Sequence, residues 1–336
     1  MSLLFLDSFD HYATADLTAK WTSITNTPAI TSGGRRSTNC VELQSGEHVK
    51  KTLAPGDTTG VVGFALNPGN PSSAFDVFYF MDVASQQVGV RVLSNLTLQV
   101  QRGGSTTLGT STLALNASTY YYIEFKALIS NTVGTYEVRV NGVNWVSGTG
   151  ADTQATANAV WNGIDVVGGN GTALVDDLYV LDGVASADPT YPDNTFLGDV
   201  RIDALFPTAE GTTIEWTPST GTNNAALVDE TPPDTTDYNS AAATEKDTYT
   251  MPDVPVSGAL ILGYQVCLYL EKTDAGACTV APVIRSVGSD YVGTAIAPSN
   301  GSYAYFLAPY SVDPATNLVP TEANWNAGEV GVKRVT

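Results

Sequence analysis

The sequence predicts an all-β protein, with an N-terminal antiparallel β-sandwich and a smaller C-terminal β-rich domain. Short runs rich in Val, Thr, Tyr and Phe alternate with Gly, Pro, Asn and Asp along the 336 residues, as expected for strands joined by tight turns. In the first half the strand centres are about 8–15 residues apart, a spacing typical of sandwiches and jelly rolls. Helical periodicity is almost absent.

The first half is expected to open with a strand over Leu3–Phe9 and one helical turn over Asp16–Trp21, with Asp16 as its N-cap. Asn141 and Gly142 give the strongest short hairpin signal, a two-residue turn between two strands. The further predicted strands are Cys40–Leu43, Val49–Leu53, Gly60–Leu66, Phe75–Val83, Val88–Leu93, Leu96–Gln101, Tyr120–Ile129, Thr135–Val140, Asn144–Gly148, Gly163–Gly168 and Val175–Leu181.

The composition changes at ASADPTYPDN, residues 185–194, which is rich in Pro, Asp and small residues, as interdomain linkers are. We therefore predict a first domain over residues 1–184, a linker over 185–195 and a second domain over 196–336. Each domain is long enough to bury a core of its own.

The second domain is expected to begin with polar, extended segments over Pro207–Pro255 that cover a core. Its predicted core is a hairpin of Ala259–Leu270 with Thr279–Arg285, followed by strands over Gly301–Leu307 and Glu329–Val335. A short helix over Thr321–Ala327, N-capped by Thr321, is expected to end at Gly328.

Two stretches of the first half resemble the laminin-G and concanavalin-A-like jelly roll. YYYIEFKALISNTVGTYEVRVNGV (Tyr120–Val143) is similar to a long strand, hairpin and turn of that fold, and VDDLYVLDG (Val175–Gly183) is similar to its closing strand. The resemblance implies that the closing strand lies beside the first strand. It implies a shape rather than a function.

Four stretches of the second half resemble a module of tailed-bacteriophage virion proteins of the tail, fibre or structural type. They are WTPSTGTNNAALVDETPPD (Trp216–Asp234), EKDTYTMPD (Glu245–Asp253), EKTDAGACTVAPVIRSVGSDY (Glu271–Tyr291) and VDPATNLVPTEANWNAGEVGVKRV (Val312–Val335). The resemblance implies a place on the surface of a virus particle and leaves head, neck and tail open.

The chain is acidic, with 15 Lys and Arg against 34 Asp and Glu and a formal net charge of −19. Because cations bind the phosphate backbone, we expect no nucleic-acid partner. The N-terminus MSLLFLDSFDHY lacks the basic region and long apolar run of a signal peptide, and no run approaches the roughly 20 apolar residues of a membrane span. We therefore expect synthesis in the host cytoplasm, no membrane partner and a final location in the virion.

The sequence shows no strong catalytic signature. His11 and His48 are the only histidines, no G-x-S-x-G elbow accompanies them, and neither zinc-ligand spacing nor a phosphate-binding glycine motif occurs. The strand-face pattern of paired acids that would indicate a glycosidase is also absent. The sequence therefore predicts a protein that is not an enzyme, with no catalytic residue.

No cofactor and no metal ligand is predicted, with a structural calcium ion as the alternative, because laminin-G and lectin folds often hold one through loop Asp and Asn. Asp176 and Asp177 are the one adjacent Asp pair, and strand alternation is expected to send them to opposite faces. The expected hairpin register separates Cys267 from Cys278 by about 13 Å, whereas a disulfide needs about 7 Å. With Cys40, these cysteines are expected to be reduced, buried thiols.

Tyr121, Trp145 and Trp161 are the candidates for contact with a glycan or a protein partner. Tyr121 lies between two further tyrosines on one strand, so at least one of the three must face outward. For Trp145 and Trp161 the alternative is the sandwich core, where large aromatic residues are common.

Together these observations predict a non-enzymatic accessory protein of the bacteriophage particle surface: a capsid decoration, collar or tail-surface component. It would act by docking to other virion proteins and would form homo-oligomers. The alternative is a tail fibre or receptor-binding protein that recognises host surface glycans, with depolymerase activity as an extension. The absence of coiled-coil heptads and β-helix repeats favours a compact protein over a fibre shaft.

Overall fold

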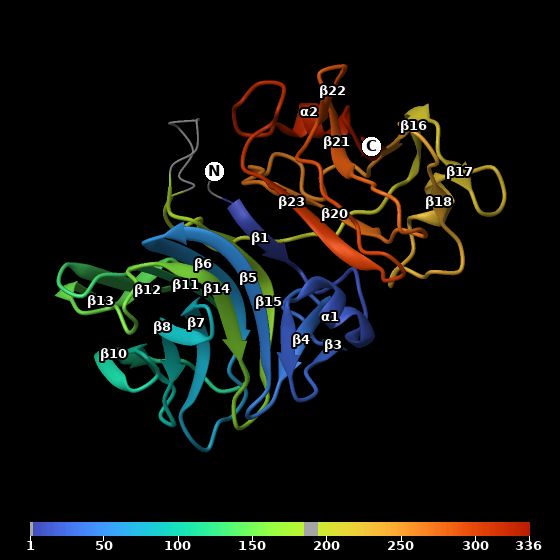
Figure 1. Ribbon diagram of the computed structural model, residues 1–336. Helices are drawn as coiled ribbons and strands as arrows, with labels where there is room; N and C mark the ends of the chain where they lie inside the picture. Colours follow the sequence, from blue (N-terminus) through green and yellow to red (C-terminus); the bar gives the residue numbers. More distant parts are fainter. Residues whose placement is uncertain (1–2, 185–193) are drawn as a thin grey trace. The chain divides into compact units, whose positions relative to one another are not determined.

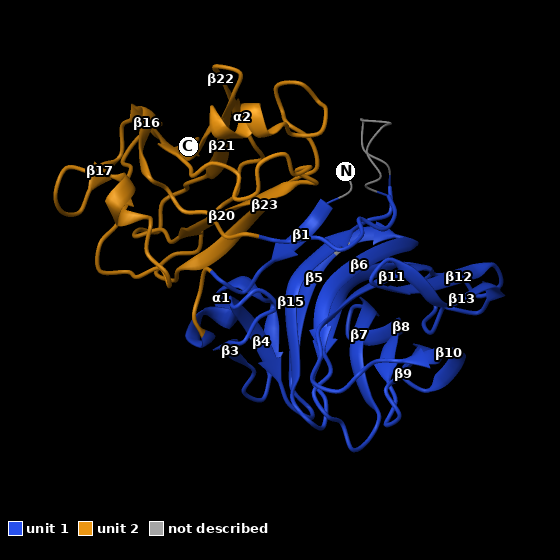
Figure 2. Ribbon diagram, turned by 180° about the vertical axis from the view of Figure 1, so that it is seen from behind, with its two compact units in different colours: residues 1–10, 14–202 blue, residues 11–13, 203–336 orange. Residues whose placement is uncertain are grey.

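The computed structural model describes residues 3–184 and 194–336 (Figure 1). They form two compact units (Figure 2): unit 1 comprises Met1–Asp10 and Thr14–Ile202, and unit 2 comprises His11–Ala13 and Asp203–Thr336. Most of the expected linker, 185–193, lies outside the described residues. Residues 196–202, which we expected in the second domain, cluster with unit 1.

Unit 1 is an antiparallel β-sandwich, so the predicted fold class is confirmed. Sheet A has eight strands in the order β13-β12-β11-β6-β15-β4-β3, with β1 beside β15 as the jelly-roll resemblance implied. Its strands are β1 (Leu3–Asp7), β3 (Ala29–Ser32), β4 (Asn39–Leu43), β6 (Thr59–Asn67), β11 (Tyr121–Leu128), β12 (Gly134–Val140), β13 (Val143–Ala151) and β15 (Ala173–Leu181).

Sheet B has seven strands in the order β10-β9-β8-β7-β14-β5-β2. They are β2 (Ser23–Thr25), β5 (His48–Asp57), β7 (Phe75–Asp82), β8 (Ser85–Val92), β9 (Thr97–Arg102), β10 (Thr106–Ala114) and β14 (Trp161–Val167). The sequence analysis missed β2, β3 and β10, because two of them are very short and β10 is rich in Thr, Ser and Gly rather than in apolar residues.

Local signals set two connections of unit 1 as expected. Asn141 and Gly142 both have positive φ, 49° and 78°, and join β12 to β13 in the tight turn that this pair favours. The expected helical turn is η1 (Thr14–Asp16) followed by α1 (Leu17–Lys20). Asp16 occupies the N-cap position, although its side chain makes no capping hydrogen bond.

Aromatic rings fill the space between the two sheets, which face each other in Figure 1. Phe64 of sheet A stacks on Phe78 of sheet B with ring centroids 6.0 Å apart, and Phe125 of sheet A lies 5.6 Å from Phe80 of sheet B. All four side chains are fully buried. Because side chains alternate along a strand, the residues next to these phenylalanines point to the two outer faces of the sandwich.

The outer face of sheet A is covered by residues 194–202, here called the strap. Phe196, only 8% exposed, packs into a cluster formed by residues of β1, β6, β11 and β15. The backbone of the strap bonds to side chains of the sheet: Gly198 N–H donates to Glu124 at 2.8 Å, and Ile202 N–H donates to Asp177 at 2.7 Å. The segment after the expected linker is therefore part of the first unit's fold.

Unit 2 is built on a five-stranded sheet in the order β16-β19-β24-β21-β22, with two two-stranded ribbons, β17-β18 and β20-β23. The strands are β16 (Ala209–Ile214), β17 (Thr217–Pro218), β18 (Asn239–Ser240), β19 (Lys246–Thr250), β20 (Tyr264–Leu270), β21 (Val280–Ser286), β22 (Ser289–Val292), β23 (Ala304–Tyr310) and β24 (Glu329–Arg334). A 3-10 helix, η2 (Ala225–Leu227), and α2 (Glu322–Asn326) complete the unit.

Two expectations for unit 2 were wrong. The predicted hairpin does not form, because β20 pairs with β23 while β21 pairs with β22 and β24. The polar segment Pro207–Pro255 does more than cover the core of unit 2. It supplies β19, which lies between β16 and β24 in the five-stranded sheet. Buried Asp247 of β19 accepts hydrogen bonds from the backbone N–H groups of Glu215 and Trp216, so polar residues hold this part of the unit together.

The predicted helix before the last strand is present. Thr321 is its N-cap, and the Thr321 hydroxyl accepts a hydrogen bond from the Asn324 N–H at 3.2 Å. In the part of the chain that the structure describes, no helix is long and apolar enough to cross a membrane.

Candidate functional site

The outer face of sheet B carries two adjacent rows of side chains that run across the strands. Strand pairing aligns the first row through Lys50, Asp165, Tyr79, Gly89 and Gln101, one residue on each of β5, β14, β7, β8 and β9. The second row is in two pieces: His48 pairs with Val167, and Asp76 pairs with Arg91, which pairs with Gln99. Most positions of the two rows carry hydrogen-bonding side chains, and Gly89 and Val167 are the interruptions.

One end of the rows is organised around the buried carboxylate of Asp165. His48 Nδ1 lies 3.0 Å from Asp165 Oδ1, and Lys50 Nζ lies 3.6 Å from Asp165 Oδ2. Because a carboxylate only accepts hydrogen bonds, His48 Nδ1 carries the proton in this contact. The other ring nitrogen, Nε2, then holds the lone pair, on a side chain that is 23% exposed.

The other end of the rows is a chain of hydrogen bonds between neutral groups. The Tyr79 hydroxyl donates to Gln101 Oε1 at 3.3 Å, and Gln101 Nε2 donates to Gln99 Oε1 at 2.7 Å. Tyr79 is fully buried, and burial raises its pKa so that the hydroxyl stays protonated. Beside this chain Arg91 Nε donates to Asp76 Oδ1 at 2.6 Å, with both side chains partly exposed.

The two outer faces of the sandwich therefore differ in kind. On sheet A the strap fills an apolar cluster. On sheet B the apolar side chains of Tyr79, Met81 and Val167 are buried, and the accessible atoms belong to His48, Lys50, Arg91 and their neighbours. An open face of this chemistry can bind a polar ligand, whereas an apolar segment would gain little from it.

The pair of His48 and Asp165 also has the geometry of a general base. A carboxylate that holds one ring nitrogen in its protonated form leaves the other nitrogen as a base, and it stabilises the imidazolium formed when that nitrogen takes up a proton. The sequence analysis did not find this pair. His48 and Lys50 alternate on one strand and Asp165 lies more than a hundred residues later, so only the strand pairing brings them together.

The three aromatic residues predicted from the sequence do not form one site. Trp161 is fully buried, packs 4.9 Å from Phe80 and donates from Nε1 to the Thr59 carbonyl, so it belongs to the core and cannot contact a glycan. Tyr121 and Trp145 are half-buried neighbours with ring centroids 6.5 Å apart, on β11 and β13. They lie on sheet A and therefore do not belong to the polar rows of sheet B.

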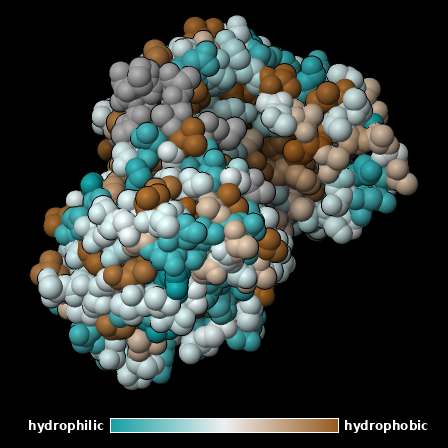
Figure 3. Space-filling view, turned by 60° about the vertical axis from the view of Figure 1, so that its left-hand side comes forward, coloured by the Kyte–Doolittle hydropathy of each residue, from teal (hydrophilic) through white to brown (hydrophobic). Residues whose placement is uncertain are grey.

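The side of unit 1 that carries β10 and β13 offers no large apolar surface. Figure 3 shows hydrophilic and near-neutral atoms over most of this side, with hydrophobic atoms in small separate patches. Leu113 of β10 and Val143 of β13 are exposed apolar residues, at 51% and 59%. Single exposed apolar residues of this kind are common on protein surfaces.

Asp176 and Asp177 do not point to opposite faces as expected. Asp177 has a positive φ of 48° within an irregular stretch of β15, and this backbone turn breaks the alternation. Both carboxylates bond to the turn after β3: Asp176 accepts from the Arg35 N–H at 2.8 Å, and Asp177 accepts from Arg36 at 2.6 Å. Burial raises the pKa of Asp176 to about 7.

Asp177 forms ion pairs with Arg35 and Arg36, whereas Asp176 accepts a hydrogen bond from the Arg35 backbone N–H. Among the described residues no group of three His, Cys, Asp or Glu side chains is placed to hold a metal ion. No disulfide joins Cys40, Cys267 or Cys278. Cys40 is buried as expected, whereas Cys267 and Cys278 are only partly buried.

No known protein-family model matches the chain. No curated protein matches its sequence. Solved structures with a partial likeness include an endo-β-1,4-glucuronan lyase from the fungus Trichoderma reesei (10% identity, TM-score 0.38, 48% of this chain and 90% of the lyase). Alginate lyase Aly36B is 12% identical with a TM-score of 0.38, over 52% of this chain and 95% of the lyase. Domain 4 of a GH43 extracellular arabinanase from Geobacillus stearothermophilus, solved with arabinotriose, is 15% identical with a TM-score of 0.37, over 47% and 81%.

These comparisons correct one prediction. We expected a protein that is not an enzyme, but the solved structures that share part of this fold include two lyases and a sialidase from Trypanosoma rangeli. The match covers 27% of the sialidase chain. The non-enzymatic assignment is therefore withdrawn. The expectation of a bacteriophage virion protein is not addressed by these findings and stays a prediction.

Proposed function

We propose that unit 1 recognises a polysaccharide that lies across the strands on the outer face of sheet B. The observation that supports this proposal is the pair of polar rows, whose accessible members His48, Lys50 and Arg91 are held by buried or partly buried partners on neighbouring strands, which lie about 4.8 Å apart. Arg91 with Asp76, and Gln99 with Gln101, offer donors and acceptors side by side in planar groups. Such planar groups can bind two neighbouring hydroxyls of a sugar, because each hydroxyl both donates and accepts a hydrogen bond.

The cations and anions of the rows balance, because Lys50 and Arg91 face Asp165 and Asp76. The chain as a whole has a formal charge of −19. The face is therefore much less acidic than the rest of the protein, and it can accept neutral and acidic sugars without the repulsion that an acidic ligand would meet elsewhere.

The test is affinity electrophoresis of the full chain through gels that each contain one polysaccharide, neutral or acidic. Arg91→Ala should weaken binding by about tenfold or more, because it removes a charged hydrogen-bonding partner. The matched control is Arg102→Ala. Arg102 pairs with Asp152 at the same side-chain exposure of 28% but outside the rows, and its loss should leave binding unchanged. Equal weakening by both substitutions, or no retardation by any polysaccharide, would refute the proposal.

The same incubations are assayed for new chain ends, since His48 is placed to act as a base. Where the wild-type protein cleaves a polysaccharide, His48→Gln should abolish cleavage while retaining the binding measured by electrophoresis. Cleavage that persists in His48→Gln would remove His48 from the reaction and leave the binding proposal intact.

We further propose, on the resemblance of four stretches of unit 2, that the chain is carried on a bacteriophage particle. Its protein partners would then be other virion proteins and further copies of itself, and its glycan would be on the host surface. Immunogold electron microscopy of purified virions tests this proposal directly. Label on the tail or neck fits glycan recognition, dense label on the head fits a capsid decoration, and no label on intact particles contradicts a surface location.

A further inference from the structure

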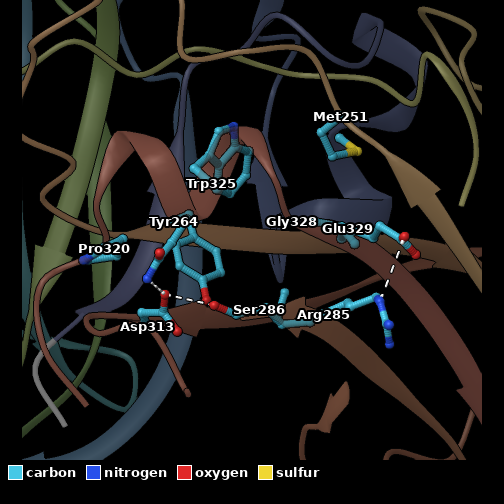
Figure 4. Close-up of a pocket in the computed structure, with 12 residues that line it drawn as sticks. Met251, Tyr264, Arg285, Ser286, Asp313, Pro320, Trp325, Gly328 and Glu329 are labelled. Carbon is cyan, nitrogen blue, oxygen red and sulfur yellow. Dashed lines mark hydrogen bonds and ion pairs between the residues drawn. The ribbon is translucent and has the colours of Figure 1, made fainter. Parts of the chain in front are cut away.

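Unit 2 contains a small pocket between α2 and the strands β21 and β24 (Figure 4). Its volume is about 30 Å³. A site for one water molecule needs about 10–15 Å³ by this measure, so the pocket has room for a group of about two or three heavy atoms. Met251, Ile284, Pro320 and Val330 supply apolar walls, and the rings of Tyr264 and Trp325 supply aromatic ones.

Most polar groups of the pocket are already engaged. Ser286 Oγ and Asn324 Nδ2 both donate to Asp313 Oδ2, at 2.8 and 3.0 Å. Trp325 Nε1 donates to the Pro252 carbonyl at 3.2 Å. Arg285 bonds to Asp290 at 2.7 Å and lies 3.8 Å from Glu329. These groups hold one another in place and are not free to bind a ligand strongly.

Tyr264 is the exception. Within the ranges that the structure describes, its hydroxyl makes no hydrogen bond, although the centre of the ring lies 5.0 Å from that of Tyr310 and 5.5 Å from that of Trp325. Burial raises the pKa of Tyr264, so the hydroxyl remains a donor across the physiological range. The pocket therefore combines one available hydrogen-bond donor with apolar walls and a volume of a few atoms.

We propose that this pocket binds the acetyl group of an acetylated sugar. The methyl group would lie against Met251, Ile284 and Val330, and the carbonyl oxygen would accept the hydrogen bond of the Tyr264 hydroxyl. The sugar ring would stay at the mouth of the pocket beside the Trp325 ring, as aromatic walls with a few oriented polar groups are typical of small-ligand sites. A plain sugar hydroxyl would leave the apolar walls unfilled, so the pocket distinguishes acetylated sugars from their parent sugars.

This site lies in unit 2 and does not depend on the face proposed for unit 1. The test is saturation-transfer difference NMR on the full chain with N-acetylglucosamine, an O-acetylated glucose, glucose and N-acetyl-lysine. The acetyl methyl of one or both acetylated sugars should receive the strongest saturation, and the two sugar arms show whether an amide or an ester is preferred. No saturation of either methyl, or stronger binding of N-acetyl-lysine than of both sugars, would overturn the proposal.

A pair of matched variants shows whether the effect comes from this pocket. Tyr264→Phe keeps the ring and removes the hydroxyl, so it should weaken binding of the acetylated sugar about fivefold. Tyr310→Phe removes a hydroxyl from the ring stacked on Tyr264 and should bind as the wild type does. Arg91→Ala in unit 1 should also leave this binding unchanged. Equal loss in Tyr264→Phe and Tyr310→Phe would mean that the hydroxyl of Tyr264 is not the donor.

Discussion

The strap can be tested by removing the ring that anchors it, with Phe196→Ala. Phe196 is 8% exposed within its apolar cluster, and the Arg139 guanidinium lies 4.2 Å from the centre of the ring. Burying a phenylalanine side chain contributes about 1.5–3 kcal/mol, and a cation over an exposed ring adds about 0.5–1 kcal/mol. Because the strap can move toward the sheet, the cavity penalty should be smaller than in a closed core. We expect a loss of about 2–4 kcal/mol in the free energy of unfolding of unit 1.

The assay is urea unfolding of the full chain, followed by the fluorescence of the buried tryptophans, with limited proteolysis as a second readout. Phe196→Ala should lower the midpoint for unit 1 and expose the strap to protease. Leu113→Ala, at a side chain 51% exposed on β10, is the control and should change the free energy of unfolding little. A loss below about 0.5 kcal/mol for Phe196→Ala would show that residues 194–202 are only resting on the sheet, and that the first domain ends near residue 184 after all.

Two further predictions concern buried charges in unit 1. Because burial raises the pKa of Asp176 to about 7, the folded protein retains a proton that the unfolded chain releases near pH 4; this contribution to stability should be lost as the pH rises from about 4 to about 7. Asp176→Asn should remove that part of the slope in unfolding midpoints measured across this range, and identical slopes in the two proteins would contradict the assignment. Lys20 Nζ lies 2.9 Å from Asp7 Oδ1 with both side chains fully buried, so Lys20→Met should lower the free energy of unfolding by about 3–5 kcal/mol. The double variant Lys20→Met/Asp7→Asn should regain part of that loss, because it leaves no unpaired buried charge. If the double variant is less stable than the single variant, Lys20 and Asp7 do not stabilise the fold as an ion pair.

The sequence predicted what depends on neighbouring residues. The strands of unit 1 with alternating apolar residues, the Asn141–Gly142 turn and the Thr321 N-cap all follow from interactions within a few residues, and the structure has them. The pairing of β20 with β23 was not predictable in this way. Both strands are apolar along most of their length, so either could pair with several partners, and alternation fixes which side chains share a face rather than which strands are neighbours.

The candidate site escaped the sequence analysis for the same reason. His48, Asp165 and Arg91 each look like an ordinary polar residue on a half-buried strand, and no spacing along the chain connects them. Their proximity follows from the order β9-β8-β7-β14-β5, in which β14 lies between strands that precede it by more than seventy residues. The aromatic residues chosen from the sequence were, by contrast, those most useful for packing, and Trp161 is accordingly in the core.

The strap also indicates which kind of ligand the open face should take. On sheet A an extended chain is held by side chains of successive strands, with Glu124, Tyr179 and Asp177 accepting its backbone N–H groups. Hydrogen bonds alone would not hold the strap on the sheet in water, because water competes for the same groups. The strap is also anchored by Phe196, which packs into the apolar cluster of sheet A. Sheet B also carries rows of hydrogen-bonding side chains, and the apolar cluster on that face, formed by Tyr79, Met81 and Val167, is buried. A peptide would find no anchor there, whereas a polysaccharide brings a donor and acceptor at nearly every ring position and needs none, which is why the polar rows favour a glycan over a protein segment.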